Sequence, residues 1–194
     1  MQHAFRSIGG EEQVKKKSFQ LENRSKESVG LAGEYAVASE LCRRGHYAQL
    51  TLGHHKKTDL LVEIKSGPSR LIFRRVSVKS KSGIAWPKVT GISDKGDVLI
   101  FVDFKGKEEN EKPDFYVLDV EAWKKVVNLK HKQSKNKGSK IDKKTNTLYW
   151  DPWEGNEKGW RGCAVRAEDV MKCKEQWKNV ARRFSAMQND AGGP

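Results

Sequence analysis

The chain has 194 residues, of which 36% are hydrophobic and 32% are charged, and its formal net charge is +13. This length allows one domain with a real core, and the low apolar fraction predicts solvated basic segments around that core. This charge makes a polyanion the expected partner, because many Lys and Arg contacts to phosphates release counterions.

The three cysteines, Cys42, Cys163 and Cys173, are too far apart in the sequence to suggest a zinc site or a disulfide framework. Cys42 and Cys173 fall at apolar positions of expected helices, which predicts small core residues. No apolar run reaches membrane-spanning length, and the basic N-terminus lacks the apolar stretch of a secretory signal. We therefore expect a cytoplasmic protein with no membrane partner.

The first expected helix covers about residues 31–44 and follows a basic, partly disordered arm at residues 1–29. Gly45 is its expected C-terminal stop. Glu34 lies on the same helical stripe as apolar residues up to Leu41. An acid therefore shares the face that should turn toward the core.

Five strands are expected after this helix, separated by turn-forming residues. The nearly continuous apolar run in the fourth of them predicts a strand buried on both faces. The stretch 79–89, which contains Gly83 and Pro87, is expected to be irregular. The expected strands cover residues 46–52, 59–64, 71–78, 97–104 and 114–120.

The C-terminal part begins with a short expected helix at residues 121–127. A Lys-rich loop is expected at residues 128–147, because lysines and polar residues dominate it. One last helix is expected from Ala167, since Val170, Cys173, Trp177, Val180 and Phe184 follow at helical spacing. A disordered tail is expected at residues 187–194.

This order of helix, three strands, irregular link, two strands and helix predicts the α/β class. Sequential strands without helices between them favour a meander in a mixed β-sheet, with helices on both faces. We expect a single domain over residues 30–186.

The strands at residues 59–64 and 71–78 bring together the groups that phosphodiester hydrolysis requires. Carboxylates hold Mg²⁺, and a nearby lysine orients the attacking water. Asp59 opens the first strand and Lys79 closes its partner, so the two meet in an antiparallel hairpin. Ser77 points to the same face as Lys79, and Glu34 from the first helix completes the cluster.

The acid-x-Lys pattern arises easily by chance in a Lys-rich chain, and it also occurs elsewhere in this one. Glu63 lies at the far end of its strand beside a turn and is expected to be a solvated charge. Asp103 follows the buried strand and is either a strand-end charge or a neighbour of the site. Asp142 lies in the Lys-rich segment and is expected to be exposed.

The segments GLAGEYAVASEL, TDLLVEI and VSVKSKSG resemble the PD-(D/E)XK nuclease superfamily, which includes restriction endonucleases and Holliday-junction resolvases. The likeness is to a bacterial branch and covers about residues 30–120. It implies a restriction-endonuclease-like fold and Mg²⁺-dependent cleavage of nucleic acid, with Mn²⁺ as a possible substitute. By position, Glu34 matches the helix acid, Asp59 the metal-binding acid and Lys79 the catalytic lysine.

Ser77 stands where this superfamily has Glu, Asp or often Gln. In that position its backbone carbonyl is the expected metal ligand, beside Asp59 and Glu34. The same replacement supports an alternative: a catalytically impaired descendant that binds DNA or a nuclease partner.

Basic residues near these strands and in the Lys-rich segment are candidate contacts to nucleic acid. Trp86, Trp150 and Trp153 lie among turn residues and are candidates for base stacking or for core packing. The candidate phosphate contacts are His55, Lys56, Lys57, Arg75, Lys81, Lys135, Lys137 and Lys140.

We therefore expect a Mg²⁺-dependent endonuclease of restriction, repair or resolvase type that acts on double-stranded or branched DNA. Double-strand cutting by a chain this small favours a homodimer. An RNA-binding or RNA-processing protein is a third possibility, because charge alone does not separate DNA from RNA.

Overall fold

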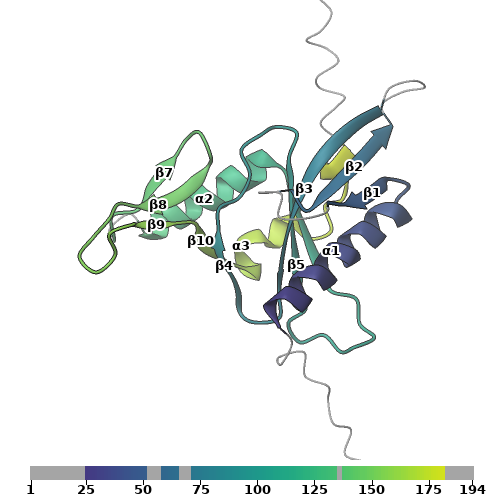
Figure 1. Ribbon diagram of the computed structural model, residues 1–194, viewed down its shortest axis with the longest axis horizontal. Helices are drawn as coiled ribbons and strands as arrows, with labels where there is room; N and C mark the ends of the chain where they lie inside the picture. Colours follow the sequence, from purple (N-terminus) through teal and green to yellow (C-terminus); the bar gives the residue numbers. More distant parts are fainter. Residues whose placement is uncertain (1–24, 52–57, 66–70, 135–136, 182–194) are drawn as a thin grey trace, which may run out of the picture.

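The computed structural model describes residues 25–51, 58–65, 71–134 and 137–181 (Figure 1). Its main sheet has the strand order β1-β2-β3-β5-β6. Only β3 and β5 run parallel, and the other neighbours are antiparallel. The expected mixed sheet flanked by helices is therefore confirmed. Its strands are β1 (Tyr47–Leu50), β2 (Leu60–Lys65), β3 (Leu71–Lys81), β5 (Val98–Asp103) and β6 (Asp114–Leu118).

Helix α1 (Lys26–Arg43) covers one face of this sheet and contacts β1, β3 and β5. It begins one turn earlier than expected, because the Ser25 hydroxyl accepts a hydrogen bond from the Ser28 N–H at 3.1 Å. Residues 26–29 are therefore helical, and their assignment to the arm is wrong. The chain leaves the helix through Gly45, whose φ is +81°.

The two faces of the sheet carry separate hydrophobic cores. Val37 and Leu41 of α1 pack with Val78 on one face. On the other face, Phe101 packs with Trp123 of α2 (Val120–Ser134). All six residues of β5 are buried, which confirms that this strand is covered on both faces.

The stretch after β3 contains a strand, so the prediction of an irregular link is wrong. Strand β4 (Ala85–Val89) pairs antiparallel with β10 (Cys163–Arg166). Pro87 is tolerated because this is a two-stranded sheet and the register shifts beside it. The pairing joins segments far apart in the chain.

The prediction of a loop at residues 128–147 is also wrong. Helix α2 continues to Ser134, where the Ser134 hydroxyl donates to the Lys130 carbonyl at 2.7 Å. A three-stranded sheet follows, with the order β7-β8-β9. Its strands are β7 (Lys140–Asp142), β8 (Thr147–Trp150) and β9 (Trp160–Arg161).

The last expected helix is broken into α3 (Ala167–Val170), the 3-10 turn η3 (Met171–Cys173) and α4 (Lys178–Ala181). Glu175 has a φ of +54°, and its N–H donates to the Phe115 carbonyl of β6 at 2.9 Å. This tertiary hydrogen bond replaces a helical one. Val170, Trp177 and Val180 are nevertheless buried as expected, whereas Phe184 lies outside the described residues.

The cysteine predictions are only partly right. Cys163 is buried, and burial raises the pKa of its thiol to about 11. Cys173 is half-buried. Cys42 is exposed, because it lies one position away from the buried Leu41 on α1 and turns toward solvent.

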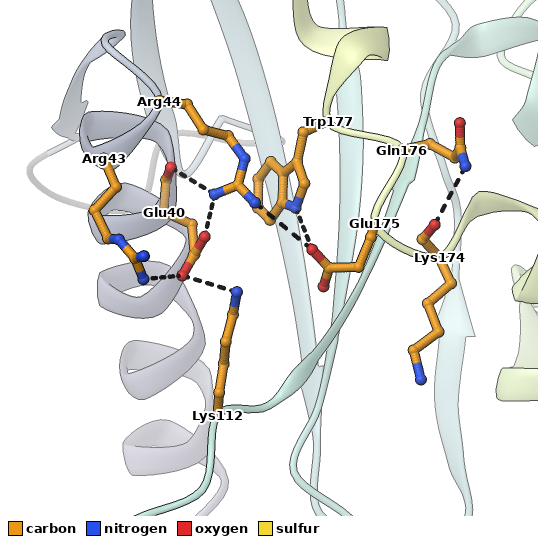
Figure 2. A network of polar contacts seen from close by, with 8 residues as sticks. All are labelled: Glu40, Arg43, Arg44, Lys112, Lys174, Glu175, Gln176 and Trp177. Carbon is orange, nitrogen blue, oxygen red and sulfur yellow. Dashed lines mark hydrogen bonds and ion pairs between the residues drawn. The ribbon is translucent and has the colours of Figure 1, made fainter.

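Glu40 of α1 is a buried acid that the sequence did not single out (Figure 2). Its carboxylate accepts a hydrogen bond from Arg44 and lies 3.0 Å from Lys112 Nζ and 3.2 Å from Arg43 Nη1. Burial by itself would raise the pKa of Glu40, but the hydrogen bonds from Arg44 and Lys112 outweigh it and hold the pKa below its ordinary value.

Arg44 extends this network to the C-terminal segment (Figure 2). Its guanidinium carbon lies 4.4 Å from the centre of the Trp177 ring, and its Nη2 lies 3.6 Å from Glu175. The Trp177 indole N–H donates to the same Glu175 carboxylate at 2.7 Å. The network therefore ties the segment before α4 to the C-terminal end of α1.

Candidate functional site

Asp59 lies at a bend immediately before β2, where the backbone changes partners. Its N–H donates to the Val76 carbonyl of β3 at 2.9 Å, while its carbonyl accepts from Thr51 at 3.0 Å on the other side. The Asp59 side chain then accepts the Val78 N–H through Oδ2 at 2.6 Å. This hydrogen bond fixes the carboxylate at the point where β2 and β3 separate.

Two side chains of β3 meet the same carboxylate oxygen. The Ser77 hydroxyl donates to Asp59 Oδ2 at 3.3 Å, and Lys79 Nζ lies 3.8 Å from it. Lys79 Nζ also donates to the Val78 carbonyl at 3.0 Å. The structure therefore brings Asp59, Ser77 and Lys79 together, as the antiparallel hairpin predicted.

Glu34 lies near this cluster on α1, a helix that packs close to β3. A side chain on Gly33 would overlap the Ser80 hydroxyl and place its Cβ 2.9 Å from the Ser80 Cβ. Partial burial and the Asp59 carboxylate both raise the pKa of Glu34, while Lys79 lowers it. Glu34 therefore lies within electrostatic reach of Asp59 and Lys79.

The backbone decides which carbonyl lies beside these acids. Neighbouring carbonyls of a strand point to opposite sides, and that of Val76 accepts from Asp59. The Val78 carbonyl therefore points toward Asp59, while the Ser77 carbonyl points toward β5. The geometry favours Val78 over Ser77 as the backbone ligand.

An oxygen-rich set of this kind fits a hard divalent cation. Asp59 and Glu34 are two carboxylates that repel each other, and a cation between them would relieve that repulsion. Mg²⁺ is commonly held by one or two carboxylates and keeps several waters. Among the described residues, no cluster of three or more His, Cys, Asp or Glu side chains could hold a metal. A cation here would therefore depend on the Val78 carbonyl and on water.

Lys81 is not a nucleic-acid contact, so that prediction is wrong. Its side chain is 3% exposed, and its Nζ lies 2.6 Å from Asp103 Oδ2. The same ammonium donates to the Gly83 carbonyl at 3.1 Å and lies 4.6 Å from the centre of the Trp86 ring. Both Lys81 and the rival acid Asp103 belong to a buried ion pair.

The other basic candidates lie at the surface or outside the described residues. Arg75 is exposed, but its guanidinium pairs with Asp97 at 2.7 Å and with Asp94 at 3.3 Å. Lys137 is exposed, and the exposed Lys140 pairs with Asp151. The candidates outside the described residues are His55, Lys56, Lys57 and Lys135.

The rival acids lie away from Asp59. Glu63 lies opposite Tyr47 of β1 and Phe73 of β3 in the sheet register, toward the other end of β2 from Asp59. Asp142 lies in β7, where hydrogen bonds from Arg161 and then Thr145 lower its pKa to about 2. Neither acid joins the cluster.

Replacing Glu34 or Glu40, two acids of α1, by glutamine should change the stability of the protein in opposite directions. The raised pKa of Glu34 means that its charge opposes folding above its ordinary pKa of 4.5. Glu34→Gln should therefore stabilise the protein at pH 7 by up to about 1 kcal/mol, as for partly exposed charges. This gain should disappear as the pH falls below 4.5.

Glu40→Gln is the matched variant on the same helix. The lowered pKa of Glu40 means that its charge stabilises the fold above the ordinary pKa of 4.5, and that this stability is lost as the pH falls through the native pKa. The variant should lose about 1–3 kcal/mol at pH 7 and converge on the parent in acid. Thermal unfolding of the parent and the two variants from pH 3 to 8 measures both stability changes. Equal signs for the two variants at pH 7 would contradict the assignment.

Comparison with known proteins gives one weak structural likeness. A solved structure of a bacterial homing endonuclease, I-Ssp6803I, matches with 16% identity and a TM-score of 0.34, over 50% of this chain and 71% of that chain. A likeness at that level supports no statement about function. No family model matches the chain, and no curated protein does. Within the described ranges, no helix is long and apolar enough to cross a membrane.

Proposed function

We propose that this protein is a metal-dependent endonuclease of the restriction-endonuclease-like class that hydrolyses phosphodiester bonds in DNA. One observation carries the proposal. Ser77 and Lys79 both lie beside Oδ2 of Asp59, and the charges of Asp59 and Lys79 both shift the pKa of Glu34. These charged groups come from α1, from the start of β2 and from β3.

Each residue has a distinct part in this proposal. Asp59, Glu34 and the Val78 carbonyl would hold the cation. Bound Mg²⁺ or Mn²⁺ supplies a Lewis acid that lowers the pKa of water and offsets charge on the phosphate. Lys79 orients the attacking water and stabilises negative charge in the transition state. Ser77 holds the Asp59 carboxylate in place through its hydroxyl.

The surroundings of the cluster suit such chemistry. Lys79 is half-exposed and Asp59 is partly exposed, so a phosphate from solvent can approach both. The net charge of +13 favours binding to a polyanion. We further propose that cleavage of both DNA strands involves a homodimer, since one cluster serves one strand.

Asp59→Asn and Lys79→Met test the proposal. Each should lower Mg²⁺-dependent cleavage of DNA by about 100-fold or more, the usual effect of losing one group that stabilises the transition state. Duplex, branched and single-stranded DNA and structured RNA should be compared, with Mg²⁺, Mn²⁺ or EDTA present. Circular dichroism and DNA binding should stay close to those of the parent.

The rival acid-x-Lys pair supplies the matched controls. Glu63→Gln and Lys65→Met change the same types of side chain near the far end of β2 and should leave cleavage intact. Cleavage that survives in both Asp59→Asn and Lys79→Met would refute the assignment.

Ser77 supports a second candidate, a catalytically impaired DNA-binding or nuclease-partner protein. A hydroxyl is a poorer ligand for Mg²⁺ than a carboxylate. Calorimetry with Mg²⁺ and Mn²⁺ separates the two candidates. An absence of both metal binding and cleavage, with DNA binding retained, favours the second.

A further inference from the structure

The β7–β8–β9 sheet extends away from the main sheet (Figure 1, left). It carries a groove lined by aromatic residues. The groove has a volume of about 800 Å³. Three of its lining residues are tryptophans, although indole rings usually lie mostly inside a protein. Its lining residues are Lys137, Gly138, Lys140, Trp150, Asp151, Trp153 and Trp160.

The fold holds these rings in defined positions. Trp150 and Trp160 are directly opposite each other on β8 and β9, so their side chains share one face. Trp153 lies in the connecting turn, which two backbone hydrogen bonds with Asn156 close at 3.2 and 2.8 Å. The Trp160 indole N–H is already satisfied by the Gly162 carbonyl at 3.0 Å. Rigid placement lowers the entropy that a stacked ligand would cost.

Two of these tryptophans are exposed to solvent. Trp153 is 50% exposed and Trp160 is 41% exposed. A second hollow of about 340 Å³ shares Trp150 and Trp160 with the first and also touches Lys88. The aromatic surface therefore continues from the turn toward β4.

Positive charge lies along the same surface. Lys88 lies at the bulge of β4 with a φ of +50°, a conformation that costs an L-residue about 1–2 kcal/mol. In this conformation, Lys88 Nζ lies 4.8 Å from the centre of the Trp160 ring. Lys137 is exposed and lines the groove, and Lys140 forms an ion pair with Asp151.

Indole faces beside ammonium groups match one class of ligand. Unpaired nucleotides offer a flat base for stacking and a phosphate for a lysine, whereas bases inside a duplex are already stacked on one another. Each stacked base contributes about 1–3 kcal/mol with little dependence on its identity. The overall charge of +13 makes a neutral or basic peptide a poorer match.

We propose that the β7–β8–β9 sheet binds a single-stranded nucleic acid segment, with unpaired bases stacked on Trp153 and Trp160 and phosphates held by Lys137 and Lys88. This binding goes beyond the proposed nuclease activity and needs no metal. The substrate class that it implies rests on the proposed function: DNA with an unpaired segment, as in a branch or a frayed end.

Binding of a fluorescent single-stranded oligonucleotide of 12 thymidines, measured by anisotropy in EDTA, tests the proposal. Trp153→Ala should weaken binding about 5- to 150-fold, the range that corresponds to one stacked base. Trp153→Phe should retain most of the affinity, because a phenyl ring still stacks. Lys137→Ala should lower the slope of affinity against salt by about one phosphate contact.

Two controls separate stacking from general charge attraction. Phe73→Ala removes another exposed aromatic ring, on β3, and should leave binding unchanged. An abasic oligonucleotide of equal length should bind the parent at least as weakly as the normal oligonucleotide binds Trp153→Ala, because it can stack on neither Trp153 nor Trp160.

Equal affinities for the normal and the abasic oligonucleotide would overturn the proposal, as would an unchanged affinity in Trp153→Ala. Because all binding is measured in EDTA, its failure leaves the nuclease proposal standing. Conversely, cleavage that survives in Asp59→Asn and Lys79→Met would refute the nuclease assignment but would leave this binding site untouched.

Discussion

Replacing Lys81 by methionine should destabilise the protein by about 3–5 kcal/mol, the usual cost of leaving one member of a buried ion pair without its partner. Asp103 would lose its ammonium partner while its side chain is only 10% exposed. The N–H of Lys105, which donates to Asp103 at 2.9 Å, would remain as a hydrogen-bond donor but cannot neutralise the carboxylate. Urea denaturation measures the change in the free energy of unfolding.

Two further variants show whether the buried charge is the cause. Lys81→Met combined with Asp103→Leu should recover most of the loss, since no charge then stays unpaired. Lys124→Met removes an exposed lysine whose partner Glu121 lies 3.1 Å away and should cost less than about 1 kcal/mol. A Lys81→Met effect as small as that of Lys124→Met would contradict the buried ion pair.

Gly33→Ala should cost about 1–3 kcal/mol, as expected for an inserted methyl group in a packed contact. Alanine normally favours a helix over glycine, by about 1 kcal/mol. Here the added Cβ would overlap the Ser80 hydroxyl and lie 2.9 Å from the Ser80 Cβ, so α1 must move away from β3. That movement carries Glu34 away from Asp59, and cleavage should fall by up to about 100-fold.

Gly30 of the same helix is the matched control, because a Cβ there would meet nothing within 4 Å. Gly30→Ala should stabilise the protein slightly and leave cleavage unchanged. Ser80→Gly in the Gly33→Ala background should restore both properties by clearing the overlap, a coupling that a double-mutant cycle measures. Gly33→Ala that is as stable as Gly30→Ala would disprove the close contact.

Local patterns in the sequence were sufficient for much of the main sheet. The continuous apolar run of β5 predicted a strand buried on both faces, and all its residues are buried. The meeting of Asp59 and Lys79 followed from antiparallel geometry alone, since the start of one strand lies beside the end of its partner. Gly33 in the middle of a helix was also a readable signal of close packing, although its meaning was missed.

Pairing between distant segments was beyond these patterns. Strand β4 is stabilised by β10, which follows it by more than seventy residues, so Pro87 misled the local prediction. The last helix breaks at Glu175 because the Phe115 carbonyl offers its N–H a tertiary partner. Such a choice depends on a hydrogen bond that exists only after the chain has folded.

The sequence by itself determined that Ser77 and Lys79 share one face, because side chains alternate along any strand, whereas it placed Lys81 in an irregular stretch. Only the tertiary structure decided their different environments. Lys79 lies at the open end of the β2–β3 pair beside Asp59, while Lys81 lies under Trp86 and against Asp103. The physical reason is that a lysine can be buried only where another part of the chain supplies a partner charge.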